Sequence, residues 1–275
     1  MINREGRTRI RIFQTQTSTN SSSVSGSDRS WSPNTLRIRM VLNYKGIPYT
    51  QSWVSYPDIR PLLKNLSVPP NAGEIYEYTL PAIVHPSCST LTNHSTALMD
   101  SLAIAIHLEE VFSSPSLFPS GNASYALALS THRVISNVVR AAQEFLVPST
   151  ALILDKRGRE YFVETRSREF GKPLAEVRPK DEETVKVKEE AVLKELGVLV
   201  KMLKGKLGKE GPFLEGERIS YGDFYIVSYL AWFQRVDRKL WERMVAMGDR
   251  ELETLWHRCL PLLEGQGEEK EWDIL

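Results

Sequence analysis

The sequence is poor in cysteine, and this scarcity excludes several classes of protein. It contains two cysteines, Cys88 and Cys259, and no Cys-x-x-Cys pair. A disulfide scaffold, a structural zinc site and a dithiol redox centre are therefore not expected. The composition instead favours a reducing, intracellular setting, and we predict a cytoplasmic protein.

Net charge and long apolar runs are also lacking. The 35 Lys and Arg residues are balanced by 34 Asp and Glu residues, so the formal net charge is +1. Without a global basic field, neither nucleic acid nor a membrane surface is an expected partner. The longest apolar run, near residues 224–233, is too short to span a bilayer, which takes about 20 residues.

The chain is long enough for two domains, and its composition changes near the middle. Its 275 residues can bury a full hydrophobic core, and 41% of them are apolar. Residues 113–122 (SSPSLFPSGN) are rich in serine and proline and are the best linker candidate. We therefore predict an atypical N-terminal segment over 1–29, an α/β domain over 30–114 and an all-helical domain over 123–265.

The two predicted domains differ in the period of their apolar residues. Before the linker, strand and helix patterns alternate, with strands expected over 48–54 and 80–84. After it, the pattern is helical, with helices expected over 125–146, 183–203, 221–236 and 249–263. The polar stretch 155–181 is expected to hold local helical segments at most.

The N-terminal segment has two opposed interpretations. Its first residues carry four arginines against one acid, and residues 14–30 are rich in Ser and Thr. Such a composition is typical of an organelle transit peptide. The alternatives are a disordered tail, or a strand followed by a long loop. Residues 8–13 (TRIRIF) favour a strand, because Arg9 and Arg11 fall on one face and Ile10 and Ile12 on the other.

Ser32 precedes Pro33 at the start of a predicted helix that ends near Gly46. The ordinary interpretation is a helix cap, with Pro in the first turn. The functional interpretation uses the same position, because a hydroxyl at a helix N-terminus can donate a hydrogen bond to an anion there. A thiolate is such an anion, and a donor together with the helix dipole lowers the pKa of a thiol.

Leu80 and Pro81 open a short apolar strand. A proline at a strand start or edge is ordinary, since it removes one ladder donor. A cis Leu80–Pro81 bond is the more specific possibility, because it would turn the Leu80 backbone toward a ligand. A peptide ligand could then pair with Leu80 as a short added strand.

Two further pairs mark helix starts. Asp100 and Ser101 are ordinary caps, but together they also suit an α-amino acid headgroup: Asp accepts from the ammonium, while backbone amides and the Ser hydroxyl bind the carboxylate. Ser220 and Asp223 form a capping box, which is a folding signal. The histidines are scattered without a metal-ligand spacing, and we interpret them as structural: His85, His94, His107, His132 and His257.

Each of these motifs is weak alone, but their order resembles that of the cytosolic glutathione transferase superfamily. Ser-Pro opens the first helix, Leu-Pro the third strand and Asp-Ser the next helix, and FLEGERISYGDFYIVSYL is similar to the capping-box region of the family's helical domain. The resemblance covers about residues 30–265. SWSPNTLRIRMVLNYKGIPYT, YTLPAI and YFVETRSREFGKPLAEV resemble the fungal etherase-like serine class, which is related to the lignin β-etherases.

The resemblance implies a fold, a reaction and a site. The fold is an α/β thioredoxin-like N-terminal domain followed by an all-α C-terminal domain. Ser32 stands where other transferases carry Tyr or Cys, Leu80 and Pro81 hold the glutathione backbone, and Asp100 and Ser101 hold the γ-glutamyl group. Lys64 is a guess for the glycine carboxylate. Glutathione is the co-substrate, no metal is needed, and the implied partners are a small hydrophobic second substrate and a second copy of the chain in a homodimer with a detoxification role.

One departure from the family leaves two functions open. Family members begin with a strand just before the active-site loop, and the first 30 residues here do not look like that strand and loop. Either TRIRIF replaces the strand ahead of a longer loop, or the sheet lacks a proper first strand. The intact set of Ser32, Pro81, Asp100 and Ser101 favours an enzyme. The abnormal N-terminus favours a non-catalytic protein that binds glutathione or aromatic ligands, or an interaction module.

Overall fold

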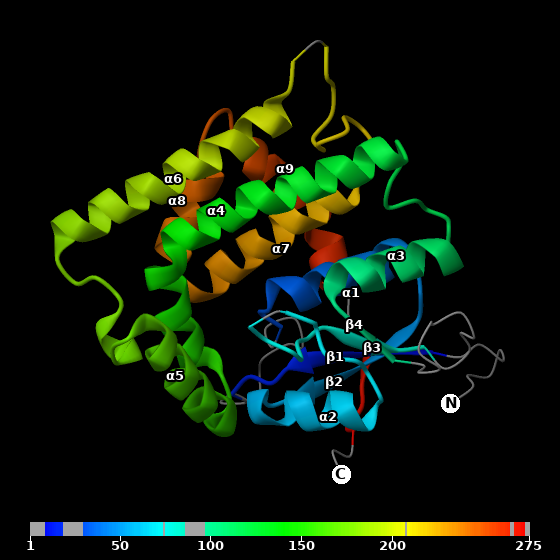
Figure 1. Ribbon diagram of the computed structural model, residues 1–275. Helices are drawn as coiled ribbons and strands as arrows, with labels where there is room; N and C mark the ends of the chain where they lie inside the picture. Colours follow the sequence, from blue (N-terminus) through cyan, green and yellow to red (C-terminus); the bar gives the residue numbers. More distant parts are fainter. Residues whose placement is uncertain are drawn as a thin grey trace. The chain divides into compact units, whose positions relative to one another are not determined.

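The computed structural model describes residues 9–18, 30–73, 75–85, 97–206, 208–264 and 267–272. Cys88 and His94 lie outside these residues. The chain divides into two compact units (Figure 1). The sheet unit comprises Met1–Pro115, Leu154–Tyr161 and Leu262–Leu275, and the helical unit comprises Ser116–Ile153 and Phe162–Pro261.

Within the described residues, five strands form one mixed sheet in the order β4-β3-β1-β2-β5. They are β1 (Ile10–Thr15), β2 (Tyr49–Val54), β3 (Ala82–Val84), β4 (Ala97–Met99) and β5 (Glu268–Glu269). β2 runs parallel to both β1 and β5, whereas β3 is antiparallel to β1 and β4. The sheet is thus built from one parallel crossover and one antiparallel meander.

β1 shows which interpretation holds for the TRIRIF part of the N-terminal segment. It lies in the middle of the sheet, with Ile10 opposite Tyr49 and Thr15 opposite Val54 on β2. Ile10 and Ile12 are buried and Arg9 and Arg11 are partly exposed, as the alternating pattern predicts. The strand interpretation of TRIRIF is therefore confirmed, and the sheet does have its first strand.

Helices cover both faces of the sheet unit. α1 (Pro33–Tyr44) and α3 (Ser101–Val111) lie on one face, and α2 (Ile59–Asn65), which follows the 3-10 turn Tyr56–Asp58, lies on the other (Figure 1). The α2 face encloses a hydrophobic cluster that includes Phe13 of β1, Leu62 and Leu63 of α2 and Met99 of β4. α1 is buried on nearly all sides, including its two arginines.

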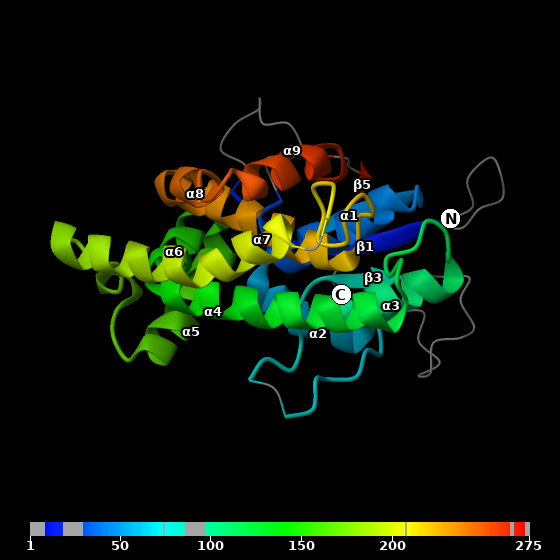
Figure 2. The same ribbon diagram turned by 90° about the horizontal axis from the view of Figure 1, so that it is seen from above.

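The helical unit is built around α7 (Tyr221–Val236). α4 (Asn122–Ile153) packs against α7 and α6 (Glu182–Lys204), and Figure 2 shows these helices side by side. α8 (Arg238–Val245) and α9 (Glu251–Glu264) complete the unit. The all-helical prediction for this part of the chain is confirmed.

The polar stretch 155–181 is more helical than its composition predicts. It contains α5 (Lys156–Phe170) and a 3-10 turn at Leu174–Glu176. α5 carries no clear apolar stripe, and its charged side chains form pairs: Arg168 donates to Glu164 at 2.9 Å, and Arg157 forms a bidentate pair with Asp58 at 2.8 Å for both bonds. The prediction of local helical segments at most was therefore wrong.

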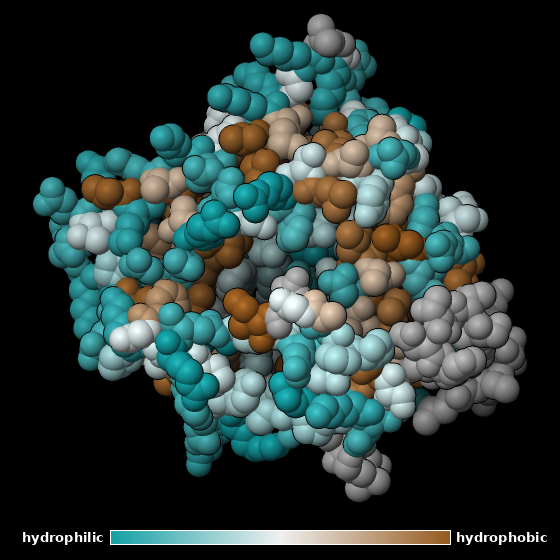
Figure 3. All heavy atoms as spheres, in the orientation of Figure 1, coloured by the Kyte–Doolittle hydropathy of each residue, from teal (hydrophilic) through white to brown (hydrophobic). Residues whose placement is uncertain are grey.

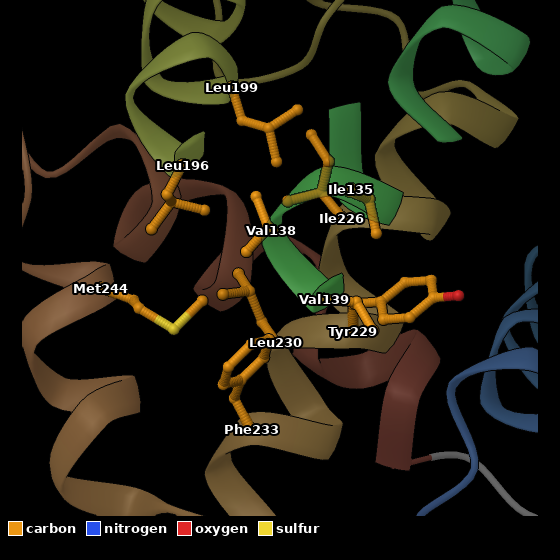
Figure 4. A pocket seen from close by; sticks show the side chains of 10 residues that line it. All are labelled: Ile135, Val138, Val139, Leu196, Leu199, Ile226, Tyr229, Leu230, Phe233 and Met244. Carbon is orange, nitrogen blue, oxygen red and sulfur yellow. The ribbon is translucent and has the colours of Figure 1, made fainter. Parts of the chain in front are cut away.

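One small cavity lies inside the helical unit (Figure 4). Ten side chains line it, and they are apolar except for the hydroxyl of Tyr229: Ile135, Val138, Val139, Leu196, Leu199, Ile226, Tyr229, Leu230, Phe233 and Met244. Its volume of about 10 Å³ is the space of about one water molecule. The cavity is a packing void between α4, α6, α7 and α8, too small for an organic substrate.

The surface is mixed in polarity. On the face seen in Figure 3, hydrophilic residues interrupt the hydrophobic ones. None of the helices in the described part of the chain combines the length and apolar character that a membrane span requires.

Candidate functional site

Ser32 occupies the cap position of α1 but does not use its side chain as a cap. Its backbone is extended (φ −65°, ψ 120°), Pro33 opens the helix, and its carbonyl accepts from the Leu36 amide at 2.9 Å. None of the described amides at the start of α1 donates to the Ser32 hydroxyl. The residue is partly exposed. The hydroxyl is therefore spare, since the helix forms without it.

The topology brings the predicted site residues to one end of the sheet. β1 and β2 are parallel and α1 connects them, so Ser32 at the start of α1 lies toward the carboxyl end of β1. β3 is antiparallel to β1 and begins just after Pro81, so Leu80 and Pro81 lie at the same end. Ala82 pairs with Met99, which places Asp100 there too. This edge is where α/β sheets usually bind ligands.

Leu80 and Pro81 are both buried, and the bond between them is cis. Among the residues that the structure describes, neither the amide nor the carbonyl of Leu80 pairs with another backbone group. Buried backbone groups are nearly always paired. Leu80 thus offers a donor and an acceptor next to β3.

Asp100 combines a capping role with an unusual backbone. Its Oδ1 accepts from the amides of Leu102 and Ala103 at 2.9 and 3.0 Å, so the capping interpretation is confirmed. Its Oδ2 has no partner within the described parts of the chain. The residue has φ 75° and ψ 125°, a conformation that costs a non-glycine residue on the order of 1–3 kcal/mol and is concentrated at functional sites.

Ser101 is buried, and its hydroxyl contacts a residue that the sequence did not single out. Arg37 on α1 donates from Nη1 to Ser101 Oγ at 3.0 Å, and only 1% of Arg37 is exposed. The bond joins the helix that begins at Ser32 to the helix that begins at Ser101. The sequence carries no clear signal for Arg37, because an arginine within an imperfect apolar face is ordinarily exposed.

Lys64 lies in the last turn of α2 and is exposed. Its Nζ lies 6.0 Å from the centroid of the Tyr78 ring, in the segment before Leu80. Arg60 approaches the same ring at 5.8 Å and pairs with Glu77 at 2.7 Å. Two cations therefore flank this segment, and sequence reasoning considered only one of them.

His85 and His107 form a buried pair. Nδ1 of His85 and Nε2 of His107 lie 3.0 Å apart, and the His85 ring stacks on Phe112. Burial lowers the pKa of both imidazoles, and in His85 the neighbouring His107 lowers it further. The described residues contain no group of three or more His, Cys, Asp or Glu that could hold a metal.

Cys259 is buried on α9, and burial raises the pKa of its thiol. Only a thiolate is an effective nucleophile. Cys259 is therefore inert at neutral pH.

Comparisons with known proteins agree with this arrangement. The family models described as Glutathione S-transferase, N-terminal domain, and Glutathione S-transferase, C-terminal domain, match residues 31–111 and 126–262. The Glutathione S-transferase-like protein ustS of Aspergillus flavus is 51% identical over 255 residues, which are 92% of each chain.

Solved structures of similar fold cover nearly the whole chain. The glutathione S-transferase CsGST63524 of Ceriporiopsis subvermispora, solved in complex with glutathione, is 29% identical with a TM-score of 0.77 over 94% of this chain and 97% of that one. The glutathione transferase GSTFuA3 of Phanerochaete chrysosporium is 25% identical with a TM-score of 0.77 over 93% and 97%. The chain belongs to the glutathione S-transferase family, with its N-terminal α/β domain and its helical C-terminal domain.

Proposed function

We propose that this chain is an enzyme that binds glutathione as the thiolate and transfers it to a small hydrophobic electrophile. The observation that carries the proposal is the Ser32 hydroxyl, which stands at the N-terminus of α1 and takes no part in capping it. A hydroxyl with no structural role at the positive end of a helix is suited to hold an anion.

Ser32 and α1 would act on the ionisation of the thiol. A free thiol has a pKa near 8.5, so little thiolate forms at neutral pH. Pro33 has no amide hydrogen, which leaves the hydroxyl of Ser32 to supply a donor at this point of the helix. The first amides of α1 add the partial positive charge of the helix end. The thiolate then attacks an electrophilic carbon and forms a C–S bond. With an aryl ether, the attack on the ether carbon breaks the C–O bond and releases the aryloxide.

The other groups of the site would bind the rest of glutathione. The backbone of Leu80 is placed to pair with the peptide, beside Pro81. The Oδ2 atom of Asp100 is an acceptor for the γ-glutamyl ammonium, and the start of α3 at Ser101 suits its carboxylate. Lys64 is a candidate for the glycine carboxylate. These roles follow the family pattern, and the spare groups of Leu80 and Asp100 support them.

We further propose that residues 30–114, completed by β1, bind glutathione and that residues 123–265 provide contacts for the second substrate. The motifs around Ser32, Leu80 and residues 161–177 support the etherase-like serine class and hence an aromatic or aryl ether substrate. We expect the protein to act as a homodimer in the cytoplasm, as the resemblance to this class implies. The alternative, a non-catalytic binding protein of the same fold, is favoured by the atypical N-terminus; the position of β1 inside the sheet supports the enzyme.

The test is the pH profile of thiolate absorbance in the glutathione complex, compared between the wild type and Ser32→Ala. We expect the variant to raise the pKa of the bound thiol toward its free value and to lower the conjugation rate at neutral pH, with recovery at high pH. Ser130→Ala, at an exposed serine of α4, is the matched control and should behave as the wild type. Superimposable profiles would remove Ser32 from the mechanism. Binding without turnover of any electrophile would support the binding protein.

A further inference from the structure

Buried polar side chains form a hydrogen-bonded network around Ser30, the residue before Trp31. Gln51 of β2 accepts from Gln14 of β1, with 2.7 Å between Nε2 and Oε1. Gln14 in turn accepts from Ser30, whose hydroxyl lies 2.6 Å from Oε1. Arg39 of α1 donates from Nη1 to the same hydroxyl. Gln14, Arg39 and Gln51 are at most 1% exposed, and Ser30 is 9% exposed.

Ser30 connects the two sides of this network. Its single hydroxyl both donates to Gln14 and accepts from Arg39, so it links the sheet to α1. Buried polar groups are expensive unless they are bonded, and a buried guanidinium more so. Arg39 also reaches the carbonyl of Leu263 at 3.4 Å and is held next to Tyr49. The removal of one hydroxyl would therefore disturb partners on both sides.

Ser32 lies two residues from Ser30, and none of the residues that the structure describes forms a hydrogen bond with its side chain. Trp31 between them is buried. Because no described amide of α1 holds the Ser32 hydroxyl, its position depends on the backbone that leads to it. Catalytic groups work only when they are held within about 0.5 Å of the productive geometry.

We propose that Ser30, bonded between Gln14 and Arg39, is a positioning residue that places the Ser32 hydroxyl against the sulfur of glutathione. This inference rests on the function proposed above. It assigns a role to a buried network that the fold alone does not require, since apolar side chains of similar size could fill the same space.

The test compares Ser30→Ala, Ser30→Thr and the wild type in steady-state conjugation and in thiolate pH titration of the glutathione complex. We expect Ser30→Ala to lower kcat by roughly ten- to a hundredfold, the scale of a misplaced group, with the KM for glutathione changed by less than about twofold. The midpoint of thiolate formation should shift to higher pH. Ser30→Thr keeps the hydroxyl and should restore most of both values.

Asn43→Ala is the matched control. Asn43 anchors the other end of α1, because its Nδ2 donates to the carbonyl of Leu262 at 2.7 Å. Its removal should lower the unfolding temperature and leave the thiolate midpoint unchanged. Gln14→Met covers the case in which Ser30→Ala fails to fold. It removes the acceptor of the Ser30 hydroxyl together with the Gln14 bond to Gln51, but it leaves the bond between Arg39 and Ser30, so the midpoint should shift in the same direction by less.

The outcomes separate the two proposals. A wild type that binds glutathione without any thiolate shift would overturn the proposed function and this inference with it. A wild type with a normal shift, together with a Ser30→Ala or Gln14→Met variant whose titration superimposes on it, would overturn only the inference. A shift in Asn43→Ala equal to that of the Ser30 variant would also overturn it, since any loosening of α1 would then suffice.

Discussion

Replacement of Asp223 with Ala should weaken the helical unit, and at pH 5 by more than an ordinary lost cap. A helix cap is usually worth about 0.5–2 kcal/mol. The Asp223 carboxylate does more than complete the box at Ser220. Its Oδ2 accepts from the amide and the hydroxyl of Ser220 at 2.8 and 2.9 Å, and its Oδ1 accepts from the amide of Leu214 at 2.8 Å. It thus joins the start of α7 to the segment before it.

The magnitude follows from those bonds and from burial. Asp223 is fully buried, so Ala leaves two amides and a hydroxyl without their acceptor, at about 1–3 kcal/mol for each amide and about 1 for the hydroxyl. An offset applies at neutral pH: desolvation, outweighing the bonds from Leu214 and Ser220, raises the pKa of Asp223 to about 6. Each unit of that rise corresponds to about 1.4 kcal/mol against the ionised form. The rise from 3.8 to about 6 thus offsets about 3 kcal/mol, and a net loss of up to about 4 kcal/mol is expected at pH 7.

The raised pKa of Asp223 also predicts how the destabilisation by Asp223→Ala depends on pH. Between the ordinary value of 3.8 and about 6, the folded protein holds a proton that the unfolded chain has released. The free energy of unfolding of the wild type therefore falls as pH rises through this window, and the penalty is complete above it. Asp223→Ala has no such group, so its destabilisation should be larger at pH 5 than at pH 7.

Denaturant unfolding of both proteins at pH 5 and pH 7, followed by circular dichroism, measures the two differences. Asp223→Asn is the matched control, because it keeps an acceptor oxygen but does not titrate; it should lose less stability than Ala and lose the pH dependence equally. Conjugation activity per folded molecule should hardly change. Equal destabilisation at the two pH values would refute the burial argument. A fall in activity at a fixed denaturation midpoint would mean that the box has a role in catalysis.

Two further changes test the sheet unit. Asp100→Ala should weaken glutathione binding by about 1–3 kcal/mol in titration calorimetry, as a charged hydrogen bond is lost; Asp181→Ala, which removes only the bond to the Thr184 amide at the start of α6, should leave affinity unchanged. Because burial lowers the pKa of His85 and His107 below 6.5, the unfolded chain binds more protons than the folded one as pH falls through and below that value, and stability is lost. His107→Gln should reduce this acid sensitivity in a thermal unfolding series, and an unchanged slope would count against the pair.

The elements that the sequence could predict are those whose own residues decide them. The Ser-Pro start of α1, the apolar stripes of α4 and α6 and the box at Ser220 are local signals, and each marks an observed helix. β1 was ambiguous because six alternating residues fit a strand as well as a tail, and only its pairing with β2 and β3 decides between them.

The elements that the sequence missed depend on distant partners. Residues 267–272 have no strand pattern, yet β5 pairs with β2, and the Trp272 ring meets that of Phe13 edge-on at 5.2 Å. Arg11 lies 4.7 Å above the same indole. Such contacts join residues near the two ends of the chain, so no periodic pattern within residues 267–272 predicts them. α5 was missed for a related reason, because some of its bonds are made to distant residues, as between Arg157 and Asp58.

α1 explains why the sequence singles out serines and not arginines as candidate site residues. Arg37 and Arg39 are two positions apart, which places them on roughly opposite sides of a helix. One donates to Ser101 at the start of α3 and the other to Ser30 before the site serine, so each side of α1 is tied to a different part of the predicted site. In the sequence pattern, the same two arginines interrupt the apolar face of the helix that begins at Pro33. The buried arginines that weaken the helix signal are therefore the groups that bond α1 to the start of α3 and to the segment before Ser32.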